Sequence, residues 1–348
     1  MGLMKYLIRR ILTSFITLLV LLSAIYLLFR LPAYLKGVSP VNVPLWALLG
    51  TKEREQLIKE LRETMGLPPA GASLKTHLHY FVMYLKHMLT LDFGWSTTYP
   101  PFRITPMLLK ALPYTLILLG SVTFFSIIVG VKVGVNLAKT PGSTKDQAGI
   151  LTGVVLNAFP VYWLAPLMIF LFSNLLGVYP PYPSGGNSLL PGVAESPDFF
   201  YRIVGSLFML ILPMATLTLG LIGTWIYLMR NSLVRTLSEG YIFTARAKGL
   251  EEEAVLFKHA LKNALIPFST NVVLSLSTLW TWVIFAEVIF KIPGIGYMLY
   301  VASGVGPLGS FDYATAQTLT YFIALTMIIG NVLSDISYGF LDPRVRYS

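Results

Sequence analysis

Six long apolar runs constrain this sequence more than any motif does. Each is long enough to cross the hydrocarbon core of a bilayer, which is about 30 Å thick and takes roughly 20 helical residues. The runs contain no Asp, Glu or Arg, and only Lys132 intrudes near the end of the second. Because lipid offers the backbone no hydrogen-bond partner, each run must be helical, and the alternation typical of barrel strands is absent. We therefore predict an all-α integral membrane protein with six transmembrane helices, at residues 11–28, 112–134, 150–176, 203–229, 265–286 and 314–334.

The overall composition agrees with this fold class. Charged residues make up 12% of the chain and the mean hydropathy is +0.69, whereas about 25% of residues are charged in soluble domains. The formal net charge of +10 does not indicate nucleic-acid binding, because no nucleic-acid-binding module is recognisable. We interpret the basic residues as determinants of membrane orientation.

Lys and Arg gather in alternate short loops, which predicts which side of the membrane each loop occupies. Both termini and the loop 230–264 are predicted to be cytoplasmic. The segment 32–110 is predicted to be extracytoplasmic, since segments above about 60 residues are translocated largely regardless of charge. The chain then divides into residues 1–31 with the first helix, the exported segment 32–110, a five-helix core 111–340, and a cytoplasmic tail 341–348. The basic residues behind this orientation are Lys5, Arg9, Arg10, Lys132, Lys139, Lys145, Arg230, Arg235, Arg246, Lys248, Lys258, Lys262, Arg344 and Arg346.

The exported segment shows helical patterns of its own. Thr51 is placed to cap a helix that Gly66 and Pro68 would end, and residues 74–91 repeat apolar side chains at helical spacing. We expect a small helical subdomain that covers the membrane helices or receives a partner.

Several chemistries find no support in the residues. The chain has no cysteine, so disulfides and thiolate metal sites are excluded. His77, His79 and His87 lie close in sequence, but no carboxylate at a matching spacing completes a metal-ligand set. No G-x-x-x-x-G-K-[ST] phosphate loop is present. We expect no metal and no nucleotide cofactor in this chain.

The hydrophilic stretch between the fourth and fifth runs has an organisation that a passive loop does not need. Leu233, Leu237 and Tyr241 share one helical face, which predicts a helix that Gly249 ends. Residues 251–264 form a second amphipathic pattern, with glutamates at its start and basic residues near its end, which suits the helix dipole. Pro267 is expected to open the next span. The sequence predicts a helix, a glycine turn and a helix in the cytoplasm.

This stretch closely resembles the EAA loop of ABC importer permeases, specifically the dipeptide/oligopeptide permease family. The resemblance is carried by Glu239, Tyr241, TARAKGL at 244–250 and HALKNALIP at 259–267. It extends over most of the chain, through KYLIRRI at 5–11, DFG at 92–94 with Ser96, LPYT at 112–115, Glu287 with PGIG at 293–296, Asp312, Tyr313, Gln317 and LDPRVR at 341–346. One departure is that Phe243-Thr244-Ala245 stands where the simplest pattern has Glu-Ala-Ala.

The resemblance implies a set of partners and a location. It implies a second, related permease subunit, one or two cytoplasmic ATP-binding subunits that hold ATP and Mg, an extracellular solute-binding protein, and the cell membrane of a prokaryote. The chain itself would be a non-catalytic subunit. The residues that the resemblance assigns to coupling with the ATPase are Glu239, Tyr241, Thr244, Ala245, Arg246, Ala247, Lys248, Gly249, Leu250, Phe257 and His259.

Polar residues in the apolar runs or at their ends are candidates for the transport pathway, because charged or polar groups are costly in a membrane and usually functional. Glu287 either lines a gate or hydrogen-bonds at a helix end, and Asn331 and Asp335 serve the pathway or polar helix packing. The candidates are Glu287, Asn157, Asn271, Ser275, Asn331 and Asp335.

A sparsely charged conduit suits an importer whose selectivity resides in an external binding protein, with peptides or oligosaccharides as solutes. A secondary transporter or channel without ATPase partners is the alternative. A secondary transporter would need carboxylates near mid-membrane and usually an internal repeat, and the sequence shows neither.

Overall fold

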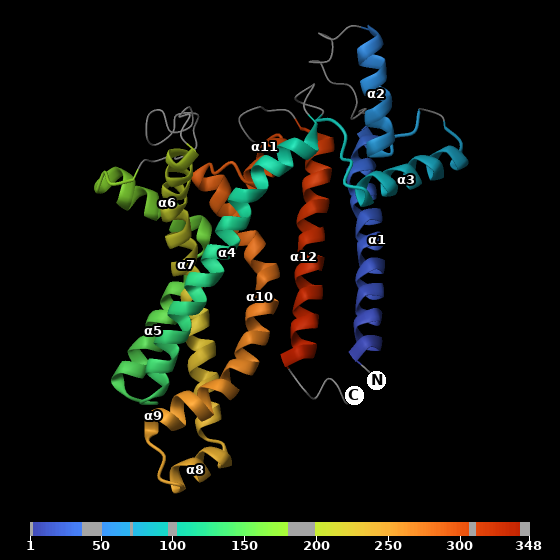
Figure 1. The fold of residues 1–348 in the computed structure, drawn as a ribbon. Coiled ribbons are helices and arrows are strands. Elements are labelled where there is room, and N and C mark those ends of the chain that lie inside the picture. The colour runs from blue at the N-terminus through green and yellow to red at the C-terminus, as the bar shows by residue number, and fades with distance from the viewer. Residues whose placement is uncertain are drawn as a thin grey trace. The chain divides into compact units, whose positions relative to one another are not determined.

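The computed structural model describes residues 3–36, 51–69, 72–96, 103–179, 199–305 and 311–341 (Figure 1). Within these ranges every regular element is a helix, and extended segments meet only at two isolated bridges, Trp95 with Arg103 and Ser303 with Phe311. The all-α prediction is therefore confirmed for the described part of the chain. The predicted tail beyond residue 341 lies outside the described residues.

The chain divides into two compact units. One consists of Met4–Tyr114 and Pro293–Val332, and the other of Thr115–Ile292 with the two chain ends. The first unit contains α1 (Leu3–Lys36), α2 (Thr51–Met65), α3 (Leu74–Leu89), the start of α4 (Ile104–Ala138), α11 (Ile295–Ala302) and most of α12 (Tyr313–Leu341).

The helices α2 and α3 confirm the pattern predicted for the segment between the first two apolar runs. α2 ends at Gly66, whose φ of +67° is the left-handed conformation that favours glycine at a helix end. The hydroxyl of Tyr26 in α1 donates to the Gly66 carbonyl at 3.0 Å, and Tyr84 in α3 donates to the Leu22 carbonyl at 3.4 Å. Two tyrosine hydroxyls therefore hydrogen-bond α1 to the end of α2 and to α3.

Asp312 organises the beginning of α12 in the same unit. Its carboxylate accepts hydrogen bonds from the backbone and side chain of Thr315, at 3.0 and 2.8 Å, and from the Ser96 hydroxyl. Its own backbone N–H donates to the Ala302 carbonyl at 2.8 Å. The buried carboxylate therefore caps α12 and joins it to the end of α11 and to the segment before α4.

The second unit holds the rest of α4 together with the helices of the central part of the chain. These are α5 (Thr144–Ala158), α6 (Val161–Ile169), the π-helix η2 (Phe170–Leu175), α7 (Phe199–Leu237), α8 (Gly240–Ala247), α9 (Glu252–Ala254), the π-helix η3 (Val255–Ala260) and α10 (Leu261–Phe290). α7 is central, and Figure 1 shows α5 and α10 beside it. Gly153 and Gly223 let α5 and α7 touch, because a Cβ on Gly223 would lie 1.9 Å from the Gly153 carbonyl oxygen.

Among the described residues, four helices are long and apolar enough to cross a membrane, and two bent helix pairs pass the same test together, so counting each pair as one span gives up to six. The single helices contain the runs predicted at 11–28 and 112–134, residues 208–229 of the run 203–229, and residues 314–333 of the run 314–334.

The third apolar run is not one helix, as predicted, but two. α5 and the α6–η2 stretch meet at an angle of 92°. Phe159 adopts an extended conformation with ψ of 114°, as expected before Pro160, which disfavours helical geometry in the preceding residue. The predicted span 150–176 is therefore bent sharply in its middle.

Candidate functional site

The residues between α7 and α10 form a compact bent structure, which we call the α8 segment (residues 238–260). It contains α8, α9 and η3 and projects beyond the ends of α7 and α10 (Figure 1). The predicted order of a helix, a glycine turn and a second helix is present.

The first predicted helix of this region is divided in two. α7 ends at Leu237, where the Ser238 hydroxyl donates back to the Val234 carbonyl at 3.0 Å. Glu239 is extended and occupies the N-cap position of α8, but its carboxylate makes no capping hydrogen bond. Ser238 competes locally with helix continuation, and the chain turns before α8 begins.

Gly249 forms the corner of the α8 segment. Its φ is +77°, a left-handed conformation that costs residues with a Cβ roughly 1–2 kcal/mol. The Gly249 N–H donates to the Arg246 carbonyl at 2.9 Å and closes the end of α8. The Arg246 guanidinium binds both carboxylate oxygens of Glu252 across the corner, at 2.7 and 3.2 Å. This hydrogen-bonded pair lowers the pKa of Glu252 and raises that of Arg246.

The α8 segment has a buried inner face and an exposed outer face. Ile242 and Ala245 of α8, with Val255, Leu256 and Ala260 of η3, are buried in one core with the ends of α4, α7 and α10. Burial of apolar side chains stabilises such a core by about 25 cal/mol per Å² removed from water. The α8 segment is therefore packed against the ends of α4, α7 and α10 and is not a flexible loop.

The second predicted helix begins with Glu252 and Glu253 in its first turn, as the sequence indicated. It then passes through η3 and continues into α10 without a break. Pro267 therefore lies inside α10, and the prediction that it opens the span is wrong. The prediction used only the local preference of proline for the first turn of a helix. In the structure the helix already begins with α9, because the buried face of η3 packs in the core, and it continues past Pro267 although this residue has no N–H to donate.

Most of the residues assigned to coupling lie on the exposed face of the α8 segment. His259 is half-buried, and Ala245 is buried in the core described above, so its side chain can act only by packing. The exposed members are Glu239, Tyr241, Thr244, Arg246, Ala247, Lys248, Gly249, Leu250 and Phe257. Phe243 was not among the residues predicted for coupling, but its side chain is 75% exposed. The signal in the sequence was a phenylalanine within a hydrophilic stretch.

The pathway candidates are distributed over α5, α10 and α12. The Thr224 hydroxyl donates to the Asn157 side chain at 2.9 Å between α7 and α5, and Ser275 donates to the Val272 carbonyl within α10. Asn331 is exposed on α12, and Asp335 belongs to the same helix but its side chain lies outside the described residues.

Glu287 is the buried carboxylate among the pathway candidates. It has 0% exposure, and the Thr115 hydroxyl of α4 donates to its Oε1 at 2.6 Å. A side chain without exposed surface does not line an open passage in this structure. The contact favours the second interpretation of Glu287, a hydrogen-bonded junction between α10 and α4.

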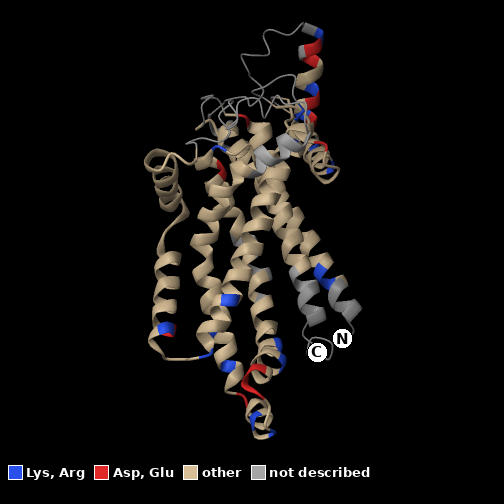
Figure 2. Cartoon of the chain, turned by 60° about the vertical axis from the view of Figure 1, so that its left-hand side comes forward, with Lys and Arg blue, Asp and Glu red and all other residues tan. Residues whose placement is uncertain are grey.

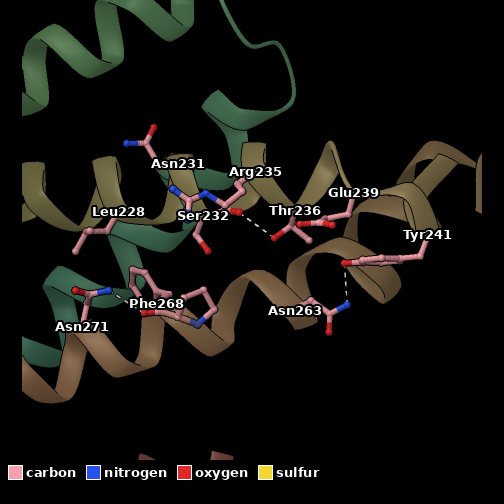
Figure 3. Close-up of a pocket in the computed structure, with 11 residues that line it drawn as sticks. Leu228, Asn231, Ser232, Arg235, Thr236, Glu239, Tyr241, Asn263, Phe268 and Asn271 are labelled. Atoms are coloured by element: carbon pink, nitrogen blue, oxygen red, sulfur yellow. Dashed lines mark hydrogen bonds between the residues drawn. The ribbon is translucent and has the colours of Figure 1, made fainter. Parts of the chain in front are cut away.

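A polar groove runs between α7 and α10 beside the α8 segment, and we call it the α7–α10 groove (Figure 3). Its volume is about 690 Å³. It brings Asn271, a pathway candidate, together with Glu239 and Tyr241, two coupling candidates. The residues that line it are Leu228, Asn231, Ser232, Arg235, Thr236, Glu239, Tyr241, Asn263, Pro267, Phe268 and Asn271.

Charged residues of the unit gather near the α8 segment, where blue and red mix on the ribbon (Figure 2). Within the described ranges no three His, Asp or Glu side chains come together to hold a metal ion. Of the three histidines considered in the sequence, His87 has a carboxylate nearby, since its Nδ1 lies 3.2 Å from Oδ2 of Asp92.

A family model for binding-protein-dependent transport system inner membrane components matches residues 126–347. The chain belongs to this family. The matched range includes the α8 segment, both helices of the groove and all residues assigned to coupling.

Relatives of this inner membrane component match it along nearly its whole length. The oligopeptide transport system permease protein AppB of Bacillus subtilis is 30% identical over 98% of this chain and 99% of its own. A probable peptide ABC transporter permease protein of Sinorhizobium fredii is also 30% identical, over 98% and 99%. The oligopeptide transport system permease protein OppB of Haemophilus influenzae is 27% identical over 99% and 100%.

The fold agrees with that of a solved transporter. A chain of the MetNI methionine ABC transporter, in an inward facing conformation, matches with a TM-score of 0.51 and 17% identity, over 70% of this chain and 100% of that one. The likeness identifies the fold as that of an ABC importer permease. The role of a translocation-pathway subunit follows instead from the family match and from the permease relatives.

Proposed function

We propose that this chain is one of two related permease subunits of an ATP-driven importer for peptides. The peptide assignment is supported by the relatives named above, which are described as oligopeptide or peptide permeases. A solute-binding protein outside delivers the peptide, and one or two ATP-binding subunits inside bind ATP and Mg. The permease itself catalyses no reaction.

The observation that carries this proposal is the two-faced packing of the α8 segment. Its inner face is fixed in the core of the helical unit, while its outer face exposes Phe243, Leu250 and Phe257. Large apolar side chains left exposed on a short projecting helical segment are typical of a protein interface. We assign the outer face to contact with an ATP-binding subunit, and Gly249 to the corner that presents it.

The packing also explains how force would pass from the ATPase to the membrane helices. η3 continues directly into α10, and α8 shares a buried core with the ends of α4 and α7. Because packed cores move as bodies rather than deform, displacement of α8 by closing ATPase subunits would rotate these helices together. A flexible loop would absorb the same displacement.

This function requires the α8 segment and both chain termini to face the cytoplasm, and the segment 32–110 to face outward. The distribution of Lys and Arg supports that orientation. The helices α2 and α3, which pack on α1, then offer an outer surface for the solute-binding protein.

The test is the substitution Phe243→Asp in the complete transporter reconstituted in lipid vesicles. We expect the ATP-binding subunit to dissociate during purification and ATP-dependent uptake of a radiolabelled oligopeptide to fall to background. The permease should still insert and keep its thermal midpoint, because Phe243 is 75% exposed.

The matched control is Lys262→Asp, which places the same acidic side chain on an exposed position just beyond the α8 segment. Uptake should persist in this variant. Full uptake by the Phe243→Asp transporter would contradict the docking role, and uptake by the permease without any ATP-binding subunit would contradict the proposed function as a whole.

A further inference from the structure

We propose that the α7–α10 groove is a binding station for the transported solute on the inner side of the pathway. The solute it accepts is a short peptide whose amino and carboxyl ends are both free and charged. This inference rests on the proposed function and adds to it a site and a recognition chemistry.

The groove has the shape of an extended binding site. Its lining residues on α7 recur at three- and four-residue spacing from Leu228 to Thr236, and those on α10 recur from Asn263 to Asn271. Such spacing places them on one face of each helix, and Figure 3 shows the two faces opposite each other. Eight residues of helix rise about 12 Å, which is the length of an extended peptide of about three or four residues.

The lining of the groove is suited to a hydrated polar solute and not to lipid. Eight of the eleven lining residues have side chains that form hydrogen bonds, although both helices are apolar overall. A volume of about 690 Å³ lies within the range of small-molecule sites, about 300–1,000 Å³. Some of the lining groups are already used inside the protein, since Ser232 donates to the Ala264 carbonyl at 2.6 Å and Asn271 donates to the Pro267 carbonyl at 2.8 Å.

Two lining residues carry opposite charges that the described part of the chain does not neutralise. Neither Arg235 nor Glu239 forms an ion pair with another described residue. By contrast, the nearby Arg230 is neutralised by the buried Asp146 at 2.5 Å. The groove therefore presents one guanidinium and one carboxylate, four positions apart in the sequence.

Glu239 stands at the N-cap of α8 but does not cap it. The short side chains of Ser, Thr, Asp or Asn contribute about 1 kcal/mol at an N-cap by bonding the first N–H groups, so a glutamate at this position forgoes a local stabilisation. Its carboxylate instead lines the groove. Departures from local preference of this kind are typical of functional sites.

A peptide with free ends complements this pair of charges. Its carboxylate matches the planar donors of Arg235, which bind carboxylates in two parallel hydrogen bonds, and its ammonium group matches Glu239. The side-chain amides of Asn231 and Asn271 lie along the groove, where backbone N–H and C=O groups of a peptide would pass. An uncharged sugar offers neither group a charge of opposite sign.

The groove also touches the part of the molecule that we assign to coupling. The Asn263 amide donates to the Tyr241 hydroxyl at 2.8 Å and joins α10 to α8 at one end of the groove. Movement of α8 would therefore change the width of the groove. This arrangement allows the ATPase cycle to weaken the binding of the peptide in the α7–α10 groove and so to release it.

The experiment uses the absence of cysteine from the chain. Single substitutions Asn231→Cys and Asn271→Cys place a thiol in the groove, and Ser238→Cys and Lys262→Cys place one on exposed positions outside it. The complete transporter is reconstituted with its inner face outward, and a membrane-impermeant maleimide is added without nucleotide. The probes are trialanine and its N-acetylated, C-amidated analogue, which has no end charges.

We expect trialanine to protect the two groove positions and not the two control positions. At a concentration of about twice its Kd the labelling rate should fall about threefold, since the unoccupied fraction is 1/(1 + [L]/Kd). The uncharged analogue should protect none of the four. Protection should disappear when Arg235→Gln or Glu239→Gln is added to Asn271→Cys and persist with Arg235→Lys.

Two results would overturn the inference. Groove cysteines that react equally with and without trialanine would show that no peptide binds there. Groove cysteines that never react would show that the second permease subunit covers the groove. ATP-dependent peptide uptake, measured on the wild-type complex, tests the proposed function separately, so that uptake without protection removes this inference alone.

Discussion

The junction between α5 and α7 and the corner of the α8 segment are each held by an arginine and a carboxylate with the same geometry. Arg230 binds Asp146 through Nε and Nη2, at 3.0 and 2.5 Å, and Arg246 binds Glu252 through the same two nitrogens, at 2.7 and 3.2 Å. The surroundings differ. The side chains of the first pair are 17% and 1% exposed, and those of the second are 45% and 71% exposed.

This difference separates a fixed part of the molecule from an adjustable one. A buried charge that loses its partner is very costly, whereas an exposed ion pair is screened by water and contributes little. α5 is therefore locked to α7 and moves with it. The corner at Gly249 keeps its shape by local hydrogen bonds and is free to adapt when a partner docks on α8.

The largest effect is expected from Asp146→Ala. The substitution leaves the partly buried Arg230 without its carboxylate, and breaking a buried ion pair by removing one partner typically costs about 3–5 kcal/mol. It also removes the acceptor for the Gly142 N–H, which lies 2.8 Å from Oδ2. We expect a large fall in the thermal midpoint of the purified permease, measured by loss of its monodisperse peak after heating.

The double variant Asp146→Ala with Arg230→Ala is the control, because removing both charges avoids the unpaired one. It should recover part of the lost stability. A wild-type midpoint in the single variant would show that this pair is no stronger than the one at the corner.

The second largest effect is expected from Gly223→Ala at the same junction. A Cβ at this position would lie 1.9 Å from the Gly153 carbonyl oxygen, so α5 and α7 must separate. Overpacking of this kind typically costs about 1–3 kcal/mol. Thermal midpoint and ATP-dependent uptake should both fall.

Gly120→Ala in α4 is the matched control, since a Cβ there meets nothing within 4 Å. Removing a helical glycine at an open position should stabilise the protein slightly, by roughly 0.5–1 kcal/mol. Equal effects of the two substitutions would mean that close packing at Gly223 does not hold the junction.

A smaller effect is expected from Gly249→Ala at the corner. Space is available, because a Cβ would meet nothing within 4 Å, but φ is +77°. The left-handed conformation costs an alanine about 1–2 kcal/mol. The protein can relieve this strain by reshaping the exposed corner, so we expect weaker association with the ATP-binding subunit and little change in thermal midpoint.

Gly249→Asn should retain more of the association, because asparagine tolerates the left-handed region better than alanine. If the thermal midpoint of Gly249→Ala falls as far as that of Gly223→Ala, the corner belongs to the same fixed region as the α5–α7 junction.

The difference between the two regions also explains what the sequence could predict. The corner is encoded locally, by Gly249 between two amphipathic patterns, and its place in the chain was predicted correctly. The lock between Asp146 and Arg230 joins residues 84 positions apart, and nothing in the local pattern of either residue indicates the other. The bend at Pro160 had a local signal, because the proline was expected to kink the span, whereas length and hydropathy alone favoured a single helix.

The same reasoning applies to the candidate site. The polarity of Asn271 in an apolar run was enough to suggest a pathway role, and the groove includes it. Arg235 was counted only as a determinant of orientation, because its position opposite α10 depends on the packing of two helices. Phe243 was not selected, since exposure of a side chain follows from which face of α8 the core buries.

The smallest effect is expected from Glu252→Gln, which breaks the exposed pair at the corner. The pKa of Glu252 is lowered by its hydrogen bonds from Arg246, so the pair stabilises the folded state above the ordinary pKa of glutamate. That contribution is lost as the pH falls through the lowered pKa. At neutral pH the thermal midpoint of the variant should lie within error of wild type, and any difference should vanish in high salt, which screens exposed charges. A salt-resistant loss of stability in Glu252→Gln would place the corner with the α5–α7 junction and remove the distinction between a fixed and an adjustable region.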